Sequence, residues 1–430
     1  MSSSDSFLDV GAKWTTDDSI KSIDYTEYQP IVGSRLNTSG QIDIIIENSD
    51  DFYLPHRSWI LFEGKLVKND NTPYEDADNV TLTNNGILYL FTNISYKLNG
   101  TLVESLNHPG HAITILNSVK NTSTFNKSSG LAQCWVPDSA TEVADNTGFK
   151  IRQSYIIKKP NSKGSFSFMI PLESILGFAE DHKTVTYGMR HSITFSRAPT
   201  DNDAIYRVAT AALAGKVELT KISWMMPKVV PNDIKRLSLL KTIGSDQILD
   251  LSFRMRQCCL IELQQATTLS WKLGLTSMTE KPRWIIVGLQ TDKINDQTKN
   301  ASLFNHCKVT NMSIILNGVK YPSFDTNADF ENMRCMPFYH AFTSFTRDFY
   351  GLDPLTGGAN VNPAAYQELT PLFVFDLTKQ SERLKSGNVD VSINMQFKEN
   401  PPANSRAYAL VINDRMWNIR SNGRNMEIQY

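Results

Sequence analysis

Alternating apolar and polar positions dominate the chain, and Gly, Pro, Asn and Asp interrupt them often. A period of two residues is typical of strands with one buried face. The pattern predicts strands at Gln41–Glu47, Ser58–Val67, Gly86–Leu90, Ile94–Leu98, Ile151–Ile157, Ser165–Ile170, Ser192–Ser196, Lys216–Met226, Ile248–Phe253, Trp284–Leu289, Val309–Leu316, Leu372–Leu377, Val389–Phe397 and Tyr408–Ile412. Helical periodicity is brief and predicts helices around Asp233–Lys241 and Pro363–Leu369. Because helices do not alternate with the strands, we expect an all-β sandwich or jelly-roll architecture rather than an α/β enzyme.

One short sequence recurs in the two halves of the chain. Residues 92–100 read TNISYKLNG and residues 310–318 read TNMSIILNG, so six of nine positions are identical at an offset of 218 residues. Each copy is a strand that runs into an Asn-Gly pair, which favours a tight hairpin turn. Chance recurrence of a common hairpin signal is one interpretation. Duplication is favoured, because the offset is close to half of the 430 residues.

The two predicted halves join near residues 228–245. Trp224–Pro227 closes a strand, Pro231 interrupts the chain, and a short amphipathic stretch leads into a new strand. This segment contains no loose Gly/Ser linker, so we expect the two halves to pack rigidly against each other.

Composition and charge exclude several classes of protein. The chain has 43 Lys and Arg against 44 Asp and Glu, a formal charge of −1, whereas a general nucleic-acid coat needs a basic excess. A hydrophobic content of 41% is too high for a disordered chain. No apolar run approaches the length of a membrane helix, and the N-terminal residues do not resemble a signal peptide.

Cysteine usage and glycosylation motifs add little to this picture. The cysteines are odd in number, scattered and without a CxxC pair, which favours free buried thiols in a reducing compartment: Cys134, Cys258, Cys259, Cys307 and Cys335. Eight Asn-x-Ser/Thr sequons accompany a sequence rich in turns, and without a secretory route they predict no glycan.

A search for catalytic or metal-binding motifs identifies no candidate residues of either kind. Only His108 and His111 bring two histidines together, and a surface loop near a hairpin end is favoured over a metal site there. His306 and Cys307 are adjacent, so in a strand they would point to opposite faces and could not form a dyad. Asp376 is interpreted as a carboxylate that caps a turn at a strand end.

Other charged groups are weak candidates for binding a cation or a nucleic acid. Glu180-Asp181 and Asp50-Asp51 are interpreted as solvated loop acids, with a cation site at subunit contacts as the other possibility. Basic residues group modestly in two places: Lys158, Lys159 and Lys163, and Arg415, Arg420 and Arg424. The second group mixes with Trp417 and Tyr430, so there weak nucleic-acid contact competes with an ordinary solvated tail.

Several stretches in both halves carry a resemblance to a known family. They are, in chain order, Phe166–Leu172, Leu176–Phe178, Tyr187–Arg190, Lys221–Pro227 with Pro231, Pro282–Asp292, Leu316–Gly318, Pro371–Leu377 and Asp414-Arg415. Together these stretches resemble the double jelly-roll major capsid proteins of Polinton/Maverick elements and adintoviruses, including copies integrated in invertebrate genomes. The resemblance spans roughly residues 35–415, with the motifs in matching order.

This resemblance implies an all-β double jelly roll of two tandem eight-stranded antiparallel sandwiches with short helices in the connections. The expected parts are an N-terminal arm at 1–35, jelly rolls at 36–232 and 233–416, and a tail at 417–430. It also implies a virion protein that assembles inside the host cell, in which three chains build a pseudo-hexagonal capsomer that tiles an icosahedral shell. A penton or minor capsid protein is the implied partner, with no cofactor, and the absence of a strongly basic N-terminal arm makes genome contact weak or indirect.

Physical considerations are compatible with a shell. Near-zero net charge lets many copies pack without strong repulsion. The long polar loops Asn117–Ser129 and Asn295–Ser302 are expected to be ordered by neighbouring chains.

Two other functions remain open. The first is a non-enzymatic tandem sandwich that binds carbohydrate or a cell surface. It would need a loop cluster of aromatic residues and carboxylates, for which Tyr339, His340, Phe342, Phe345 and Tyr350 are candidates, although such residues more often fill an interface core. The second is a β-sandwich hydrolase, which would need an acid pair or metal triad that the sequence does not contain.

Overall fold

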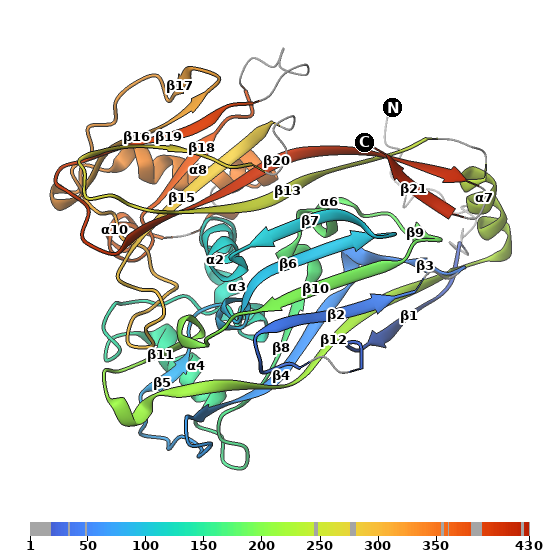
Figure 1. Ribbon diagram of the computed structural model, residues 1–430, viewed down its shortest axis with the longest axis horizontal. Coiled ribbons are helices and arrows are strands. Elements are labelled where there is room, and N and C mark those ends of the chain that lie inside the picture. The colour runs from blue at the N-terminus through green and yellow to red at the C-terminus, as the bar shows by residue number, and fades with distance from the viewer. Residues whose placement is uncertain are drawn as a thin grey trace, which may run out of the picture.

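The computed structural model describes residues 19–32, 35–47, 50–244, 248–275, 281–353, 357–359, 361–379, 389–422 and 425–429. Each half of the chain forms a sandwich of two antiparallel sheets (Figure 1). The long strands β13 and β20 of the second sandwich extend above β7 of the first, and β13 contacts β7. The two sandwiches therefore pack side by side and are not separated by a linker.

The first sandwich pairs a four-stranded sheet in the order β2-β10-β6-β7 with a larger sheet in the order β8-β4-β12-β3-β9, to which β1 adds by pairing with β12. A small sheet of β5 and β11 lies beside them. The strands are β1 Ile20–Tyr28, β2 Gly40–Ile46, β3 Phe52–Tyr53, β4 Trp59–Lys68, β5 Val80–Leu82, β6 Phe91–Leu98, β7 Thr101–Asn107, β8 Ser165–Pro171, β9 Thr186–Tyr187, β10 His191–Arg197, β11 Ile205–Arg207 and β12 Gly215–Pro231.

The second sandwich repeats this plan with the orders β14-β19-β16-β17 and β13-β20-β15-β18, and β21 folds back to pair with β20. Each sandwich thus has two sheets of at least four strands, as the sequence predicts, with additional strands in the described residues. The strands are β13 Leu249–Glu262, β14 Thr268–Lys272, β15 Pro282–Thr291, β16 Val309–Leu316, β17 Val319–Tyr321, β18 Leu372–Asp376, β19 Val391–Phe397, β20 Ser405–Asn422 and β21 Asn425–Gln429.

The repeated sequence occupies the same place in both sandwiches. Residues 92–100 lie in β6 and its turn into β7, and residues 310–318 lie in β16 and its turn into β17. Asn99 and Asn317 have left-handed φ values of 48° and 47°, as a tight hairpin requires. The side chain of Asn99 accepts the amide of Arg190 at 2.7 Å, and that of Asn317 accepts the amide of Asp390 at 2.7 Å. The two halves therefore share a structural detail as well as a sequence.

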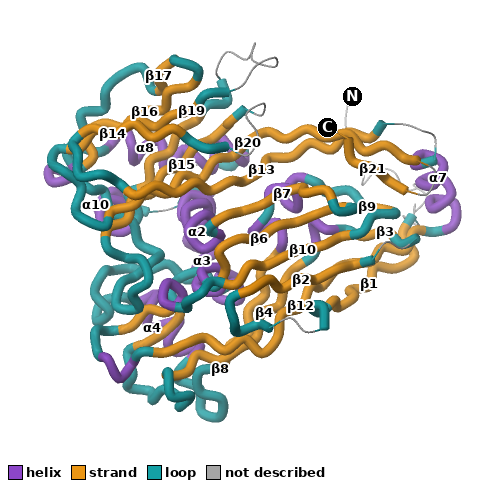
Figure 2. The backbone as a smooth tube through the Cα atoms, viewed as in Figure 1, coloured by secondary structure: helices purple, strands orange, loops and turns teal. Residues whose placement is uncertain are grey.

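Short helices occupy the connections (Figure 2). They are α1 Gly86–Tyr89, α2 Pro109–Lys120, α3 Ser123–Lys127, α4 Thr147–Ile156, α5 Leu172–Ile175, α6 Gly177–Asp181, α7 Asp233–Ile243, α8 Met336–Tyr350 and α10 Pro363–Leu369. The predicted helices at α7 and α10 are confirmed. Their Asn N-caps, Asn232 and Asn362, accept backbone amides at 2.7 and 2.8 Å, which satisfies donors that a helix start leaves open.

Two predicted strands are wrong. Gly86–Tyr89 forms helix α1 with Leu90 as its C-cap, and Ile151–Ile156 lies in α4 with Ile157 as its C-cap. All four residues of α1 are buried, so the sequence there has no polar position that would reveal a helical periodicity. The signal that starts helix α4 lies before the predicted strand Ile151–Ile157, because Asn146 caps the helix by accepting the amide of Phe149 at 3.0 Å.

The ends of the chain extend the sheets. β1 lies in the region expected to be an arm, and β20 continues through residue 416 as far as Asn422. The exact boundaries of the expected jelly rolls stay a prediction.

Buried apolar side chains from both sandwiches form one connected core. Strand β6 alternates buried and more exposed positions, as a strand with one packed face does. Strand β15 is buried at seven consecutive positions because α8 covers its outer side, where Trp284 meets Phe345 at 5.0 Å between ring centroids. No helix within the described ranges is long and apolar enough to cross a membrane.

Candidate functional site

The junction between the two sandwiches contains a buried set of ion pairs. Arg254 and Arg256 lie two residues apart on β13, so both side chains leave the strand on the same face. That face meets α6 of the first sandwich. Arg254 binds Asp181 with N–O distances of 2.5 and 2.9 Å, and Arg256 binds Glu180 at 2.6 Å. The guanidinium of Arg254 also lies 4.1 Å from the ring centroid of Phe349 on α8.

Glu180 is the centre of this cluster. Besides Arg256, its carboxylate accepts the ammonium of Lys120 at 2.8 Å and the hydroxyl of Tyr350 at 2.9 Å. Burial alone would raise the pKa of Glu180, but Arg256 and Lys120 outweigh it and lower that pKa to about 2. Glu180 therefore stays charged and joins α2, α6, α8 and β13 at one point.

A second buried carboxylate crosses the same junction. Glu104 on β7 is fully buried and accepts the backbone amides of Gly177 at 3.1 Å and Phe178 at 2.9 Å, at the start of α6. It also accepts the amide of Arg256 in the other sandwich at 2.8 Å. Burial raises the pKa of Glu104, which Arg256 and these amides partly offset.

The loop between β15 and β16 attaches the second sandwich to the first. Its Asn300 and Ser302 donate to one oxygen of buried Asp138 at 2.9 and 3.0 Å. The other oxygen of Asp138 accepts Arg152 at 2.6 Å and Asn146 at 2.7 Å, both from the first sandwich. A buried charge is tolerated when it is paired and hydrogen-bonded in this way.

Other contacts strengthen this attachment. Gln297 in the same loop donates to the carbonyl of Gly215 at 2.7 Å and accepts the amide of Gly215 at 3.2 Å, so it mimics a strand partner. On α2, His111 stacks on Tyr408 of β20 at 4.0 Å between centroids and 9° between planes. The two sandwiches are held together by polar and aromatic contacts as well as by the shared core.

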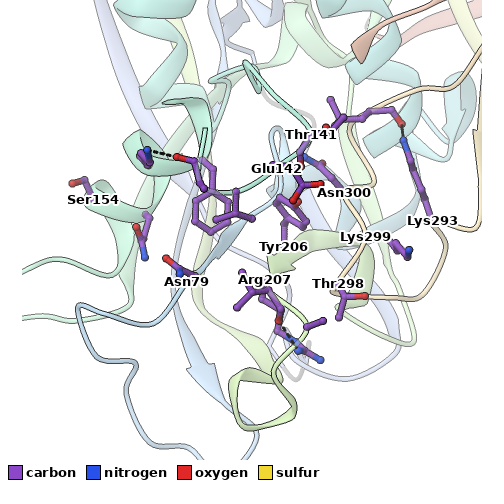
Figure 3. Close-up of a pocket in the computed structure, with 18 of the residues that line it drawn as sticks. Asn79, Thr141, Glu142, Ser154, Tyr206, Arg207, Lys293, Thr298, Lys299 and Asn300 are labelled. Atoms are coloured by element: carbon purple, nitrogen blue, oxygen red, sulfur yellow. Dashed lines mark hydrogen bonds between the residues drawn. The ribbon is translucent and has the colours of Figure 1, made fainter. Parts of the chain in front are cut away.

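A cavity of about 830 Å³ lies between this loop and the first sandwich. Its wall comes from α4 and the segments around Asn79, Glu142 and Tyr206 on one side, and from loop residues 293–305 on the other. Figure 3 shows Tyr206, Glu142 and Asn300 near the middle of the lining, with Lys293 and Lys299 to one side and Arg207 below.

The lining of this cavity is strongly basic. Five of its side chains are cationic and one is acidic, in this order along the chain: Glu142, Lys150, Lys158, Arg207, Lys293 and Lys299. Within the described ranges, none of the five cations forms an ion pair. Arg207 donates to Gln297 at 3.0 Å and to carbonyls, while Lys293 donates to the carbonyl of Leu303 at 2.9 Å. Burial lowers the pKa of Lys293 to about 8.

Comparison with known proteins assigns the fold. A family model described as "Double jelly roll-like domain" matches residues 80–417. The chain belongs to this double jelly roll-like family.

Solved viral structures share this double jelly roll over nearly the whole chain. A chain of the Sputnik virophage has a TM-score of 0.66 at 10% identity, covering 100% of this protein and 92% of that chain. The Faustovirus major capsid protein has a TM-score of 0.58 at 8% identity and covers 95% and 92%. The mavirus major capsid protein has a TM-score of 0.51 at 10% identity and covers 99% and 93%. No curated protein matches the sequence.

Several sequence-based interpretations change in this double jelly roll. His108 and His111 do not lie in a surface loop, because they begin the buried helix α2, where His111 is 6% exposed. Glu180 and Asp181 are not solvated loop acids but part of the ion-pair cluster on α6. The loop Asn295–Ser302 is ordered by the other jelly roll of the same chain.

The aromatic candidates for a binding loop also lie elsewhere. Phe342 and Phe345 are buried in helix α8, and Tyr350 bonds to Glu180, so these residues support the core and the junction. His306 and Cys307 lie in a turn, where His306 stacks on Phe330 at 4.8 Å. In the described part of the chain no group of three His, Cys, Asp or Glu side chains could hold a metal ion.

Two predictions are confirmed in detail. The carboxylate of Asp376 accepts the amide and hydroxyl of Thr378 at 2.8 and 2.6 Å, so it caps the strand end as expected. The five cysteines are free, and all but the half-buried Cys259 are buried. Lys158 and Lys163, by contrast, separate: Lys163 pairs with Glu75 at 2.6 Å, whereas Lys158 lines the cavity.

Sequence reasoning missed both the ion-paired junction and the basic cavity. Their residues are far apart in the chain, since Glu104 meets Arg256 and Lys150 faces the loop of Lys293. The only local signal was the pair of arginines at alternate positions, Arg254 and Arg256, just beyond the predicted strand Ile248–Phe253.

Proposed function

We propose that this protein is a major capsid protein with a structural rather than a catalytic role. Three copies form a pseudo-hexagonal capsomer, and capsomers tile an icosahedral shell of a virion. Penton or minor capsid proteins complete the shell, and contact with the genome is weak or indirect.

The observation that carries this proposal is the rigid pairing of two similar jelly rolls in one chain. The junction of Glu180 and Arg256, the loop contacts of Asp138 and the shared core fix the angle between the two sandwiches. A tile with six similar sides from three chains requires such a fixed pair. The full-length likeness to two structures described as major capsid proteins, of mavirus and Faustovirus, adds support.

Exposed apolar side chains on the surface could form contacts between chains. Ile234 and Leu237 on α7 are 81% and 69% exposed, and Met416 on β20 is 71% exposed. Exposed apolar groups of this size commonly mark protein interfaces. Helix α7 buries none of its residues within the chain, so it is available to a neighbour.

The test is the mass of the purified chain in solution, followed by electron microscopy. A species of three times the 48.5 kDa chain mass, with hexagonal particles or closed shells, is the expected result. Ile234→Glu with Leu237→Glu is expected to weaken association between chains. A chain that stays monomeric at every concentration, and forms no particles, would contradict the proposal.

A further inference from the structure

The basic cavity contains more positive charge than its own chain balances. Lys150, Lys158, Arg207, Lys293 and Lys299 line it with Glu142 as the one acid. Several cations in other places have carboxylate partners: Lys120 pairs with Glu180, and Lys308 pairs with both Glu331 and Glu399. The protein as a whole has a formal charge of −1, so the excess is local.

This local excess has an energetic consequence. Like charges around one cavity repel each other, and low-dielectric walls strengthen the repulsion. Lys293 offers three N–H donors, and the bond to the carbonyl of Leu303 uses one of them. Lys158 and Lys299 are exposed and form no side-chain hydrogen bond within the described ranges. Donors and positive charge are thus available to a ligand.

We propose that this cavity binds a small ligand that carries several phosphate or sulfate groups, held between the two jelly rolls. Lys150, Lys158 and Arg207 bind it from the first jelly roll, and Lys293 and Lys299 bind it from the second. Charge-assisted hydrogen bonds to such oxyanions are short and strong.

The size of the cavity selects the class of ligand. A volume of about 830 Å³ falls within the usual range for small-molecule sites and exceeds the volume of one phosphate ion several times. A single oxyanion would leave most of the five cations unbalanced. A compact ligand with several oxyanion groups matches both the volume and the charge.

The ionisation of Lys293 supports this interpretation. Asp138 and Cys307 face its ammonium and raise the pKa, while Lys299 lowers it, and burial outweighs them all to give a value of about 8. A bound oxyanion would raise the pKa of Lys293 again. Binding at pH 8.5 is therefore expected to take up a proton, and affinity is expected to fall as the pH rises above 8.

Calorimetric titration of the full-length chain tests the proposal, with two probes that represent two sources of the same chemistry. Inositol hexakisphosphate represents cellular phosphate compounds, and a heparin tetrasaccharide represents sulfated glycans. Binding of either probe, weakened by added NaCl, is the expected result, and the tighter probe identifies the source. Uncharged myo-inositol should not bind.

Variants locate the site. Lys158→Met and Lys299→Met change exposed side chains, so both should fold, and each is expected to weaken binding roughly five- to tenfold. Lys293→Met should weaken binding and abolish the proton uptake at pH 8.5. Lys97→Met is the matched control, because Lys97 is exposed on β6 outside the cavity, and its affinity should equal that of the wild type.

Three outcomes would overturn the proposal. The first is that neither probe binds at millimolar concentration. The second is that Lys97→Met weakens binding as much as Lys299→Met, because the attraction is then a general effect of charge. The third is that a single-stranded DNA oligonucleotide binds more tightly than both probes through the same lysines, which would assign the cavity to nucleic acid. None of these measurements depends on assembly of a shell.

Discussion

Arg256 illustrates how a single buried charge can hold two sandwiches together. Its side chain is 1% exposed, and it donates to Glu180 and to the carbonyls of Glu173 and Ser174 across the junction. Without Arg256, the carboxylate of Glu180 keeps Lys120 as a cationic partner but loses its most deeply buried one. Removing one partner of a buried pair is strongly destabilising. Arg256→Met is therefore expected to lower the free energy of unfolding by about 3 kcal/mol, measured by urea denaturation at fixed protein concentration.

Arg406→Met provides the control for this prediction. Arg406 pairs with Glu262 at 2.5 Å, but the carboxylate of that pair is 73% exposed. Exposed pairs contribute about 1 kcal/mol or less, so this variant should remain close to the wild type. Equal losses in the two variants would show that burial at the junction has no special importance.

Buried histidines should make the fold sensitive to acid. Burial lowers the pKa of His111 and of His191 to about 3, from an ordinary value of 6.5. Below pH 6.5 the unfolded chain binds protons at these residues while the folded chain does not, so stability falls as the pH drops from 6.5 toward 3. Glu180, whose folded pKa is about 2, adds a further loss between pH 4.5 and 2.

His111→Phe tests the histidine contribution. The phenyl ring can keep the stack on Tyr408 but cannot bind a proton. The decrease in unfolding free energy between pH 6.5 and 4 should be smaller in this variant than in the wild type. His340→Phe, on the exposed side of α8, should leave the decrease unchanged. A pH profile of His111→Phe that matches the wild type would contradict the assignment.

At the scale of the elements, the contact of α6 with β13 depends on a glycine. A Cβ atom placed on Gly177 would lie 1.8 Å from the carbonyl oxygen of Arg254 in the other sandwich. Gly177→Ala must therefore push α6 away from β13, at an expected cost of about 2 kcal/mol in thermal or urea unfolding. Gly274→Ala is the control, because no atom of the described residues lies within 4 Å of its added Cβ.

Strands were easier to predict than helices, for a physical reason. Val309–Leu316 matches β16 at both ends, because its alternation and its Asn-Gly turn are local signals. The sequence did not predict α2, since ten of its twelve residues are buried and no polar face marks a helical period. Helix α8 was also missed, because its many Phe and Tyr residues are as typical of strands as of helices.

The junction and the cavity could not be predicted from local patterns at all. Their charges come from β7, α2, α6, β13 and two loops, which meet only after both sandwiches form. Near neutrality of the whole chain concealed the local gathering of five cations around one acid. The duplicated hairpin, by contrast, predicted the two-part architecture, because each copy is a local signal only nine residues long.

On the scale of the whole molecule, the two jelly rolls should unfold together. Their apolar side chains form one connected core, and two polar networks cross the junction. We expect a single transition by scanning calorimetry at neutral pH, with equal calorimetric and van't Hoff enthalpies. Two separate transitions would show that each half is stable alone.

The unequal strands at the ends of the chain have a further consequence. β1 adds to a sheet of the first sandwich and β21 to a sheet of the second, so the two halves have different borders. In the proposed capsomer of three chains, the border with β1 and the border with β21 alternate around its six sides. One gene product then supplies two kinds of side in a fixed one-to-one ratio. A mutation on one border changes three sides of the tile and leaves the other three free to evolve separately.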